Sequence, residues 1–169
     1  MINSSDKPII RVAVESDFAG IREVVYEVWP IAYREMISQE QIAYMLDMMY
    51  TDDSLRKQIN EEGCMFLVHE NNARIEGFAS FSQVEGSLYK LHKLYVYSIL
   101  QGRGIGQALL NRVKQLVATE GGNAIELQVN KKNIAQHFYL KQGFTIDREL
   151  VLDIGNGFVM DDYIMKVRL

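Results

Sequence analysis

The spacing of apolar residues along the chain changes at Cys64. Before Cys64 the apolar side chains recur three or four residues apart, which predicts helices, whereas after it they alternate, which predicts strands. Further strands and helices then alternate up to the C-terminus. This order indicates an α/β or α+β fold in which helices cover a mixed sheet. The 169 residues show no internal repeat and no break in composition, so the sequence predicts one domain over residues 1–169.

The predicted elements begin with a strand at Ile9–Val14 and a helix that Ser16 caps. Pro30 is expected to end or kink that helix near Trp29, because the residue before a proline avoids the helical conformation. The other predicted elements are helices at Ser38–Met49, Asp53–Glu62, Ile105–Thr119 and Asn133–Gln142 (the last capped by Asn133), strands at Met65–His69, Ile75–Ser82, Leu88–Tyr97 and Ala124–Val129, and two final strands, one from Phe144 and one at Phe158–Leu169.

Composition excludes several functional classes. The chain has 18 Lys and Arg against 22 Asp and Glu, and a net charge of −4 argues against a dedicated nucleic-acid-binding protein. The single cysteine, Cys64, excludes an intramolecular disulfide and a metal site built on cysteine pairs, and we expect it to be a small buried residue. No apolar run approaches the roughly 18 residues of a membrane span, and the N-terminus lacks a signal core. The sequence therefore predicts a cytoplasmic protein without a membrane partner.

A glycine-rich loop joins a predicted strand to the predicted helix at Ile105–Thr119. Gly102, Gly104 and Gly106 stand at alternate positions in this loop, where they let the backbone approach a ligand closely. The first N–H groups of a helix have no partner within the helix and lie at the positive end of its dipole. With Arg103 adding charge, the loop predicts a binding site for a diphosphate group.

The spacing of these glycines excludes two common diphosphate loops. A P-loop requires lysine after its last glycine, but Gln107 follows Gly106. A dinucleotide fingerprint requires glycine or alanine three residues after its second glycine, and Gln107 and Leu109 occupy the two candidate positions. A turn without a ligand is the remaining alternative, and the three glycines with Arg103 favour a ligand over it.

Two motifs resemble those of the GCN5-related N-acetyltransferase (GNAT) superfamily. The first is Gln101-x-x-Gly104-x-Gly106, which follows a strand and is similar to the pyrophosphate loop of that family. The second runs from Asn133 through Phe138-Tyr139 to Gly143-Phe144. The resemblance extends from Ile10 to the last strand, and a weaker likeness points to bacterial polyamine acetyltransferases. It implies a mixed, mostly antiparallel sheet that is flanked by helices and splayed between the fourth and fifth strands.

The resemblance also implies acetyl-CoA (coenzyme A) as the cofactor and assigns residues to it. The strand that carries Leu94, Tyr95 and Val96 would pair with the pantetheine arm. Asn133 matches an asparagine that contacts the cofactor. The backbone amides that would bind the pyrophosphate belong to Gln101, Gly102, Arg103, Gly104, Ile105, Gly106 and Gln107.

Two residues are candidates for proton transfer. Tyr139 matches a tyrosine near the thioester sulfur, and a hydroxyl with a pKa of about 10 suits protonation of a leaving thiolate. Periodicity alone would make Tyr139 a packed aromatic on a short helix. The period of two places His92 on one face with Leu94 and Val96, and His92 matches a histidine that some members use in a water-linked proton relay. A histidine hydrogen-bonded within the sheet is the alternative.

Other ionisable residues are expected to be structural. His69 and His137 fit no motif, and Glu76 and Glu126 are alternative carboxylates that we expect to be solvated strand residues. No metal is required for the chemistry.

The resemblance implies an acceptor pocket between the first two helices and the strand ends, with Trp29, Pro30, Tyr33 and Met36 near it. Aromatic walls and carboxylates suit a cationic amine, so Trp29 and Tyr33 are expected to bind the substrate. Asp161 and Asp162 are expected in a solvated turn, and a place beside the pocket is the alternative for them. The function hypothesis is acetyl transfer from acetyl-CoA to the primary amine of a small molecule, within a ternary complex. A non-catalytic acyl-CoA-binding module and a peptide or protein N-terminal acetyltransferase are the alternatives, and the sequence leaves a homodimer, which is common in the family, undecided.

Overall fold

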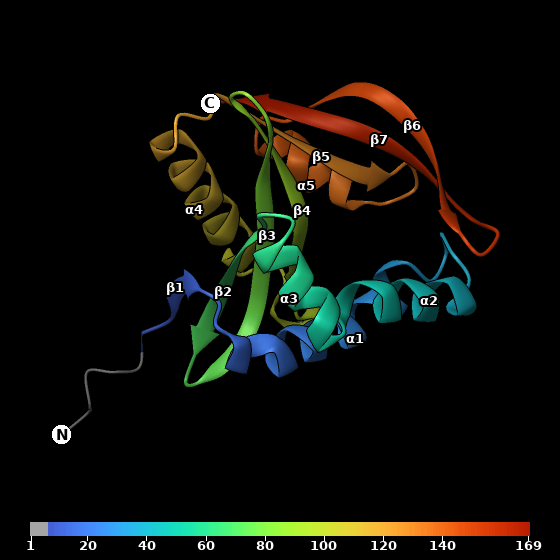
Figure 1. Cartoon of the computed structure of the whole chain (residues 1–169), viewed down its shortest axis with the longest axis horizontal. Coiled ribbons are helices and arrows are strands. Elements are labelled where there is room, and N and C mark those ends of the chain that lie inside the picture. The colour runs from blue at the N-terminus through green and yellow to red at the C-terminus, as the bar shows by residue number, and fades with distance from the viewer. Residues whose placement is uncertain (1–6) are drawn as a thin grey trace.

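A computed structural model describes residues 7–169, and the first six residues of the predicted domain lie outside the described part. Seven strands form one sheet in the order β1-β2-β3-β4-β5-β7-β6 (Figure 1). The strands are β1 (Ile9–Val12), β2 (Met65–Asn71), β3 (Arg74–Glu85), β4 (Leu88–Val96), β5 (Ala124–Asn130), β6 (Thr145–Gly155) and β7 (Phe158–Arg168). The helices are α1 (Phe18–Ala32), α2 (Gln39–Tyr50), α3 (Asp52–Asn60), α4 (Ile105–Thr119) and α5 (Ala135–Lys141).

The mixed, mostly antiparallel sheet is confirmed, because only the β4–β5 pair is parallel. This pair is short: it runs from Leu88 opposite Ala124 to Leu91 opposite Leu127. Beyond that point β4 continues to Val96 and β5 to Asn130 without pairing to each other. The predicted splay between the fourth and fifth strands is therefore present, and we call the unpaired stretch the β4–β5 opening.

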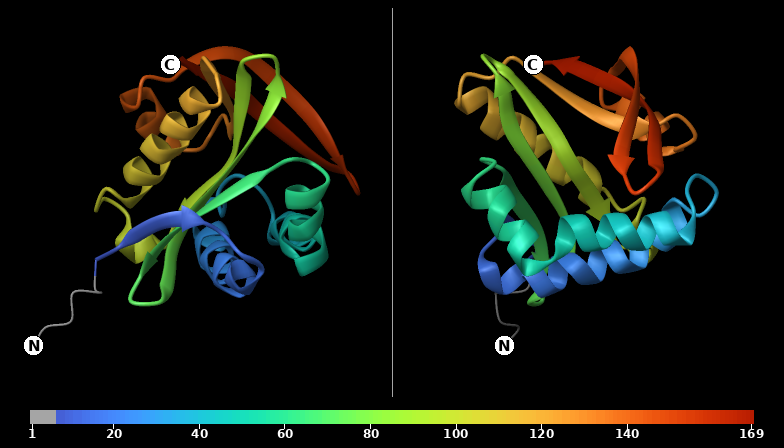
Figure 2. Two further views of the ribbon diagram at one scale, coloured as in Figure 1. Left: turned by 60° about the vertical axis from the view of Figure 1, so that its left-hand side comes forward. Right: turned by 45° about the vertical axis from the view of Figure 1, so that its right-hand side comes forward.

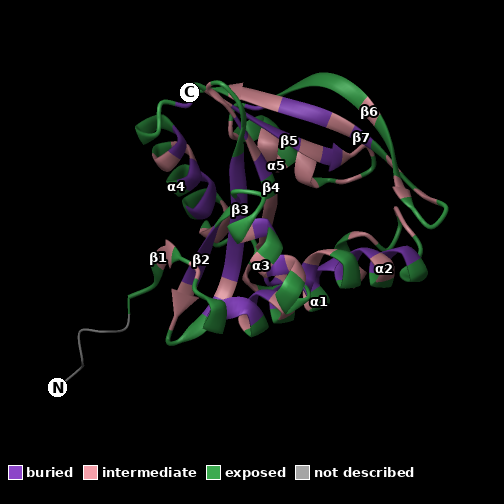
Figure 3. Cartoon of the chain, in the orientation of Figure 1, coloured by how far each residue is buried: buried purple, intermediate pink, exposed green. Residues whose placement is uncertain are grey.

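Helices cover both faces of the sheet. The helices α1, α2 and α3 pack on one face and α4 packs on the other, which Figure 2 shows from two sides. The first face is built on aromatic and aliphatic side chains such as Phe66, Phe78 and Trp29, and the second on Leu109, Val113 and Leu127. Figure 3 shows that the buried residues follow the central strands and the inner sides of α1 and α4, whereas β6 is mostly exposed at the edge.

The β6–β7 hairpin reaches across to α2. The Tyr44 hydroxyl donates to the Ile154 carbonyl at 3.3 Å, and the Tyr44 ring lies 5.4 Å from the ring of Phe158. Gln41 of α2 also donates from Nε2 to the Val159 carbonyl at 3.4 Å. The right-hand view of Figure 2 shows the hairpin tip next to the end of α2. The first two helices and the hairpin thus lie on the same side of the β4–β5 opening.

Several predicted helix ends differ from the observed ones by up to three residues, and α3 ends at Asn60 rather than Glu62. A 3-10 turn at Glu15–Asp17 precedes α1, so Ser16 lies inside that turn rather than at the helix cap. Pro30 stands within the last turn of α1, which continues to Ala32 because only one backbone donor is missing there. α5 begins at Ala135, and the Asn133 Oδ1 accepts from the Ala135 N–H at 2.8 Å just outside the helix.

Within residues 7–169 no helix is long and apolar enough to cross a membrane.

Candidate functional site

The loop before α4 exposes unpaired backbone donors. The first backbone hydrogen bond of the helix runs from Ala108 N to Gly104 O at 2.9 Å, so the N–H groups of Ile105, Gly106 and Gln107 have no partner within it. Gly102 and Gly104 have φ angles of +80° and +85°, which favour glycine. A Cβ atom built on either glycine would meet no atom within 4 Å, so the space in front of the loop is open. These residues fit an anion such as a diphosphate.

The loop is tied to the end of β4, where the β4–β5 opening begins. The Gln101 side chain donates from Nε2 to the Val96 carbonyl at 3.2 Å. Leu94 and Val96 pack on the α4 face of the sheet, whereas Tyr95 packs on the α1 face. Since β5 does not pair with these three residues, this edge of β4 can pair with an extended ligand. Arg103 is exposed at the outside of the loop.

Tyr139 lies on α5, in contact with the apolar layer under α4. Its ring packs edge-on against Phe144 with centroids 5.6 Å apart. Burial, and then the charge of Tyr33, raises the pKa of the Tyr139 hydroxyl above its ordinary value. A raised pKa keeps this hydroxyl protonated at neutral pH, as a proton donor requires.

The predicted orientation of His92 is wrong. Lys93 pairs with Ser80 and Leu91 pairs with Phe81, so His92 is an extra residue in a β-bulge. The bulge shifts the alternation of β4, and His92 lies on the face opposite that of Leu94, with its Nε2 2.7 Å from the Ser82 Oγ.

His92 borders a pocket of about 540 Å³ beneath α2 and α3. His92 is exposed as a residue, but partial desolvation beside this pocket, and then the charges of Lys93 and Lys90, lowers its pKa to about 4. The ring is therefore neutral at pH 7. Lys93 lies in the same pocket, where its Nζ donates to Gln58 Oε1 at 2.7 Å. Burial lowers the pKa of Lys93 to about 8. Neither the motifs nor the periodicity of the sequence predicted that Lys93 lies in a pocket, because the residues next to a β-bulge give no local sign of it.

Cys64 also lines this pocket. The thiol is buried, as predicted, and burial raises its pKa. A thiol with a raised pKa is a weak nucleophile at neutral pH.

The substrate residues expected from the sequence come together at the end of α1. The Trp29 and Tyr33 rings pack edge-on with centroids 4.9 Å apart, and the Tyr33 hydroxyl lies 3.0 Å from the Tyr95 hydroxyl. Trp29 is buried, and its Nε1 has no hydrogen-bond partner among the described residues. Tyr95 was expected only to line the cofactor strand through its backbone, but its side chain belongs to this aromatic group. We call Trp29, Tyr33, Tyr50 and Tyr95 the aromatic cluster.

Three carboxylates differ from their predicted environments. Asp162 does not lie in a solvated turn: it stands within β7, is 2% exposed, and lies opposite Asn130 of β5. Glu126 is buried, with Arg148 Nη1 at 3.4 Å. Glu76 is largely covered and lies 3.2 Å from the Nδ1 of His69, which is itself buried. The prediction failed because β3, β5 and β7 each lie between two other strands, where side chains of other strands cover these carboxylates.

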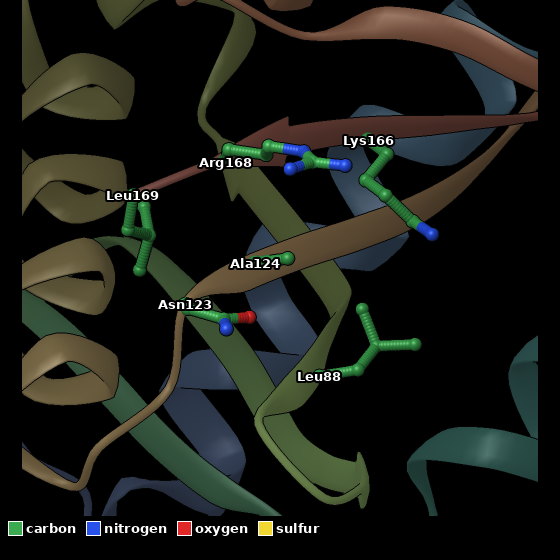
Figure 4. A pocket seen from close by; sticks show the side chains of 6 residues that line it. All are labelled: Leu88, Asn123, Ala124, Lys166, Arg168 and Leu169. Carbon is green, nitrogen blue, oxygen red and sulfur yellow. The ribbon is translucent and has the colours of Figure 1, made fainter.

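A second pocket, of about 410 Å³, lies at the opposite end of the β4–β5 pair. Figure 4 shows Lys166 and Arg168 extending over it from β7, with Leu88 and Asn123 at its other walls. None of the predicted site residues lines this pocket. We therefore take the glycine loop, the β4–β5 opening and the aromatic cluster as the candidate site. The pocket at His92 borders it, because the Nζ of Lys93 in that pocket lies 5.5 Å from the centre of the Tyr50 ring.

The comparisons with known proteins agree with this geometry. The family model described as the acetyltransferase (GNAT) domain matches residues 33–161. The uncharacterized N-acetyltransferase YuaI of Bacillus subtilis (strain 168) is 25% identical over 134 residues, which cover 77% of this chain and 76% of that protein.

Two solved structures share the fold. PaiA N-acetyltransferase from Thermoplasma acidophilum, in complex with coenzyme A, superposes with a TM-score of 0.81 at 24% identity, covering 96% of this chain and 99% of that one. YncA from Salmonella typhimurium, with its cofactor acetyl-CoA, gives a TM-score of 0.64 at 22% identity, covering 96% and 94%.

Proposed function

Because this chain belongs to the GNAT family and is an acetyl-CoA-dependent acetyltransferase, we propose that its acceptor is the primary amine of a small cationic molecule. The observation that carries the proposal is the aromatic cluster, in which Trp29 and Tyr33 lie against Tyr95 of β4, the strand that borders the β4–β5 opening. Aromatic faces attract organic cations such as ammonium groups. A polyamine is the acceptor that best fits this proposal.

The cofactor has a matching set of residues in this proposal. The amides at the start of α4, from Gln101 to Gln107, would hold the pyrophosphate, and the free edge of β4 at Leu94–Val96 would hold the pantetheine arm. Asn133, which is fixed by its bond to Ala135 N, would contact the cofactor beside α5. Acetyl-CoA supplies the thioester when it is bound.

Tyr139 is our candidate for the acid. A thiolate that leaves a thioester needs a proton, and the raised pKa of Tyr139 keeps its hydroxyl in the donating form. The transfer is direct in this proposal, because Cys64 is buried with a raised pKa and is a poor covalent nucleophile.

His92 is our candidate for relaying a proton from the acceptor through water. Its lowered pKa keeps the ring neutral above about pH 5, so it can accept a proton at neutral pH, although only weakly. We expect His92→Gln to lower kcat for amine acetylation severalfold while the KM for acetyl-CoA stays unchanged. Steady-state kinetics measure both constants, and an unchanged kcat would remove His92 from the reaction.

The proposed function is tested by measuring thiol release from acetyl-CoA against polyamines, amino acids, aminoglycosides and short peptides. We expect release with small cationic amines. Cofactor binding with no acceptor-dependent release would favour a non-catalytic acyl-CoA-binding module. Release with peptides alone would favour a peptide or protein N-terminal acetyltransferase.

A further inference from the structure

One oxygen of the buried Asp162 carboxylate has no hydrogen-bond partner. Asp162 is 2% exposed, and its Oδ2 accepts from the Gln128 Nε2 at 2.7 Å. Its Oδ1 is buried and has no partner within residues 7–169. A buried charge without a partner is costly, so natural proteins seldom keep one without a reason.

No cation of the described chain forms an ion pair with this carboxylate. Lys131, whose charge reaches Asp162, is itself bonded to Asp161 Oδ1 at 2.8 Å and to Glu149 Oε2 at 3.0 Å. Burial raises the pKa of the Asp162 carboxyl, and the amides of Gln128 and Asn130 offset this rise only in part and carry no charge. The Asp162 side chain is therefore buried with neutral polar groups near it, and its Oδ1 is an acceptor without a donor.

The position of Asp162 places it beside the β4–β5 opening. It lies opposite Asn130, the last residue of β5, which is three residues beyond the last β5 residue that pairs with β4. Gln128 and Asn130 lie on the face of β5 opposite that of Leu127 and Val129, which pack under α4. Asp162 consequently faces the side of the sheet that α1 and the aromatic cluster occupy.

Tyr33 connects this carboxylate with the aromatic cluster. Burial raises the pKa of the Tyr33 hydroxyl, the hydrogen bond with Tyr95 lowers it, and the charge of Asp162 raises it again. Tyr95 and Asp162 come from strands on the two sides of the opening, and the hydroxyl of Tyr33, which follows α1, lies 3.0 Å from that of Tyr95.

We propose that Oδ1 of Asp162 binds the ammonium group of the acceptor amine at the β4–β5 opening, on the side of the sheet that the aromatic cluster occupies. This inference rests on the proposed function, because it names the group that receives the substrate of that same site. An ammonium supplies the N–H donor and the positive charge that Oδ1 lacks. The amine is then held between the carboxylate and the aromatic faces, and it loses its proton in the separate step assigned above.

The test uses spermidine as the probe and compares Asp162→Asn with a matched control. Asp161→Asn removes the same charge one residue away, where the Asp161 side chain is exposed and contacts Lys131. Spermidine binding to each full-length protein saturated with coenzyme A is measured by calorimetry, and KM and kcat are measured with acetyl-CoA. We expect Asp162→Asn to weaken spermidine binding about tenfold or more. The control should change it less than about twofold, and the KM for acetyl-CoA should stay constant in both variants.

Thermal unfolding separates a binding defect from a folding defect. Removing a buried, incompletely paired charge should leave the melting temperature of Asp162→Asn equal to or above that of the parent protein. If Asp162→Asn unfolds at the same temperature as the parent protein but binds spermidine more weakly, the result supports the assignment of Oδ1 as the ammonium-binding group. Parent-like spermidine affinity in Asp162→Asn overturns it.

The outcomes also distinguish this inference from the proposed function. If the parent protein acetylates amines and Asp162→Asn keeps the same KM for them, the Asp162 site fails and the proposed function stands. If no amine is acetylated but spermidine binds the parent protein and not Asp162→Asn, the Asp162 site stands and the proposed function fails.

Discussion

Lys93 is an ammonium group held in an environment that opposes its charge. It lies over the rings of Tyr50 and Phe66 at 5.5 and 5.7 Å, and burial lowers its pKa from 10.5 to about 8. Between these two pKa values the unfolded chain binds more protons than the folded chain. The contribution of Lys93 to stability therefore rises as the pH increases from 8 to 10.5.

We expect Lys93→Met to stabilise the protein at pH 7, by about 1–2 kcal/mol, because methionine keeps the apolar stem and removes the buried charge. Urea unfolding at pH 7 and pH 10 measures the effect, and the gain should shrink at the higher pH. Lys132→Met, at an exposed position, serves as the control. A gain that is equal at both pH values would contradict the assignment of the effect to the charge.

Tyr139 is tested by removing its hydroxyl alone. We expect Tyr139→Phe to lower kcat about 100-fold, which is typical for the loss of a general acid, and to leave the affinity for acetyl-CoA within about twofold. Steady-state kinetics and calorimetry separate the two constants. Tyr26→Phe on the exposed side of α1 should change neither. An unchanged kcat would mean that Tyr139 only packs against Phe144.

For single residues, the sequence indicated which side chains lie together more accurately than it indicated their orientation and burial. The aromatic pair Trp29 and Tyr33 was expected and the two residues are in contact. The orientation of His92 was wrong, because a bulge depends on how two strands pair and leaves no mark in the local pattern. The sequence predicts a solvated Asp162, but its side chain is buried because β7 lies between β5 and β6. This order of strands in the sheet differs from their order in the chain, so the local sequence does not indicate it.

Among the helices and loops, the start of α4 is where we expect a substitution to affect cofactor binding most. Gly104 has a φ of +85°, and a β-branched residue is strained in that conformation and would stand in front of the amides that are expected to bind the pyrophosphate. We expect Gly104→Val to weaken binding of coenzyme A at least tenfold while the protein still folds. Calorimetry with coenzyme A and circular dichroism measure these two properties.

Gly86→Val is the matched control for this prediction. Gly86 also has a positive φ, of +54°, and also has open space where a Cβ would stand, but it lies in the β3–β4 turn. Both variants should lose similar stability, and only Gly104→Val should lose affinity for coenzyme A. If both variants bind equally well, the loop is not the phosphate site.

Elements with strong local signals were predicted accurately. The bounds of α4 agree with the prediction at Ile105–Thr119, because its apolar residues follow the helical period without interruption. The helix start at Asn133 was wrong by two residues, since an asparagine side chain can satisfy a backbone donor in a turn as well as at a helix cap. The splay between β4 and β5 was predicted from the family resemblance alone, because residue patterns do not encode where two parallel strands separate.

For the whole molecule, the β4–β5 opening predicts where a ligand changes the dynamics of the sheet. We expect coenzyme A to slow amide hydrogen exchange at residues 92–96 of β4 far more than at residues 88–91. The latter already pair with β5 in the free protein, so they serve as an internal control. Exchange followed by mass spectrometry or NMR measures the difference. Equal protection of both stretches would contradict binding along the free edge of β4.

The incomplete pairing of β4 and β5 has a consequence for the survival of this protein in a cell. A ligand that binds only the folded chain shifts the folding equilibrium toward it, and the shift grows with the ratio of free ligand to its dissociation constant. The protein should consequently resist proteases longer when its nucleotide reactant is abundant than when that metabolite is scarce. Its turnover would then follow the metabolic state of the cell without any dedicated regulator.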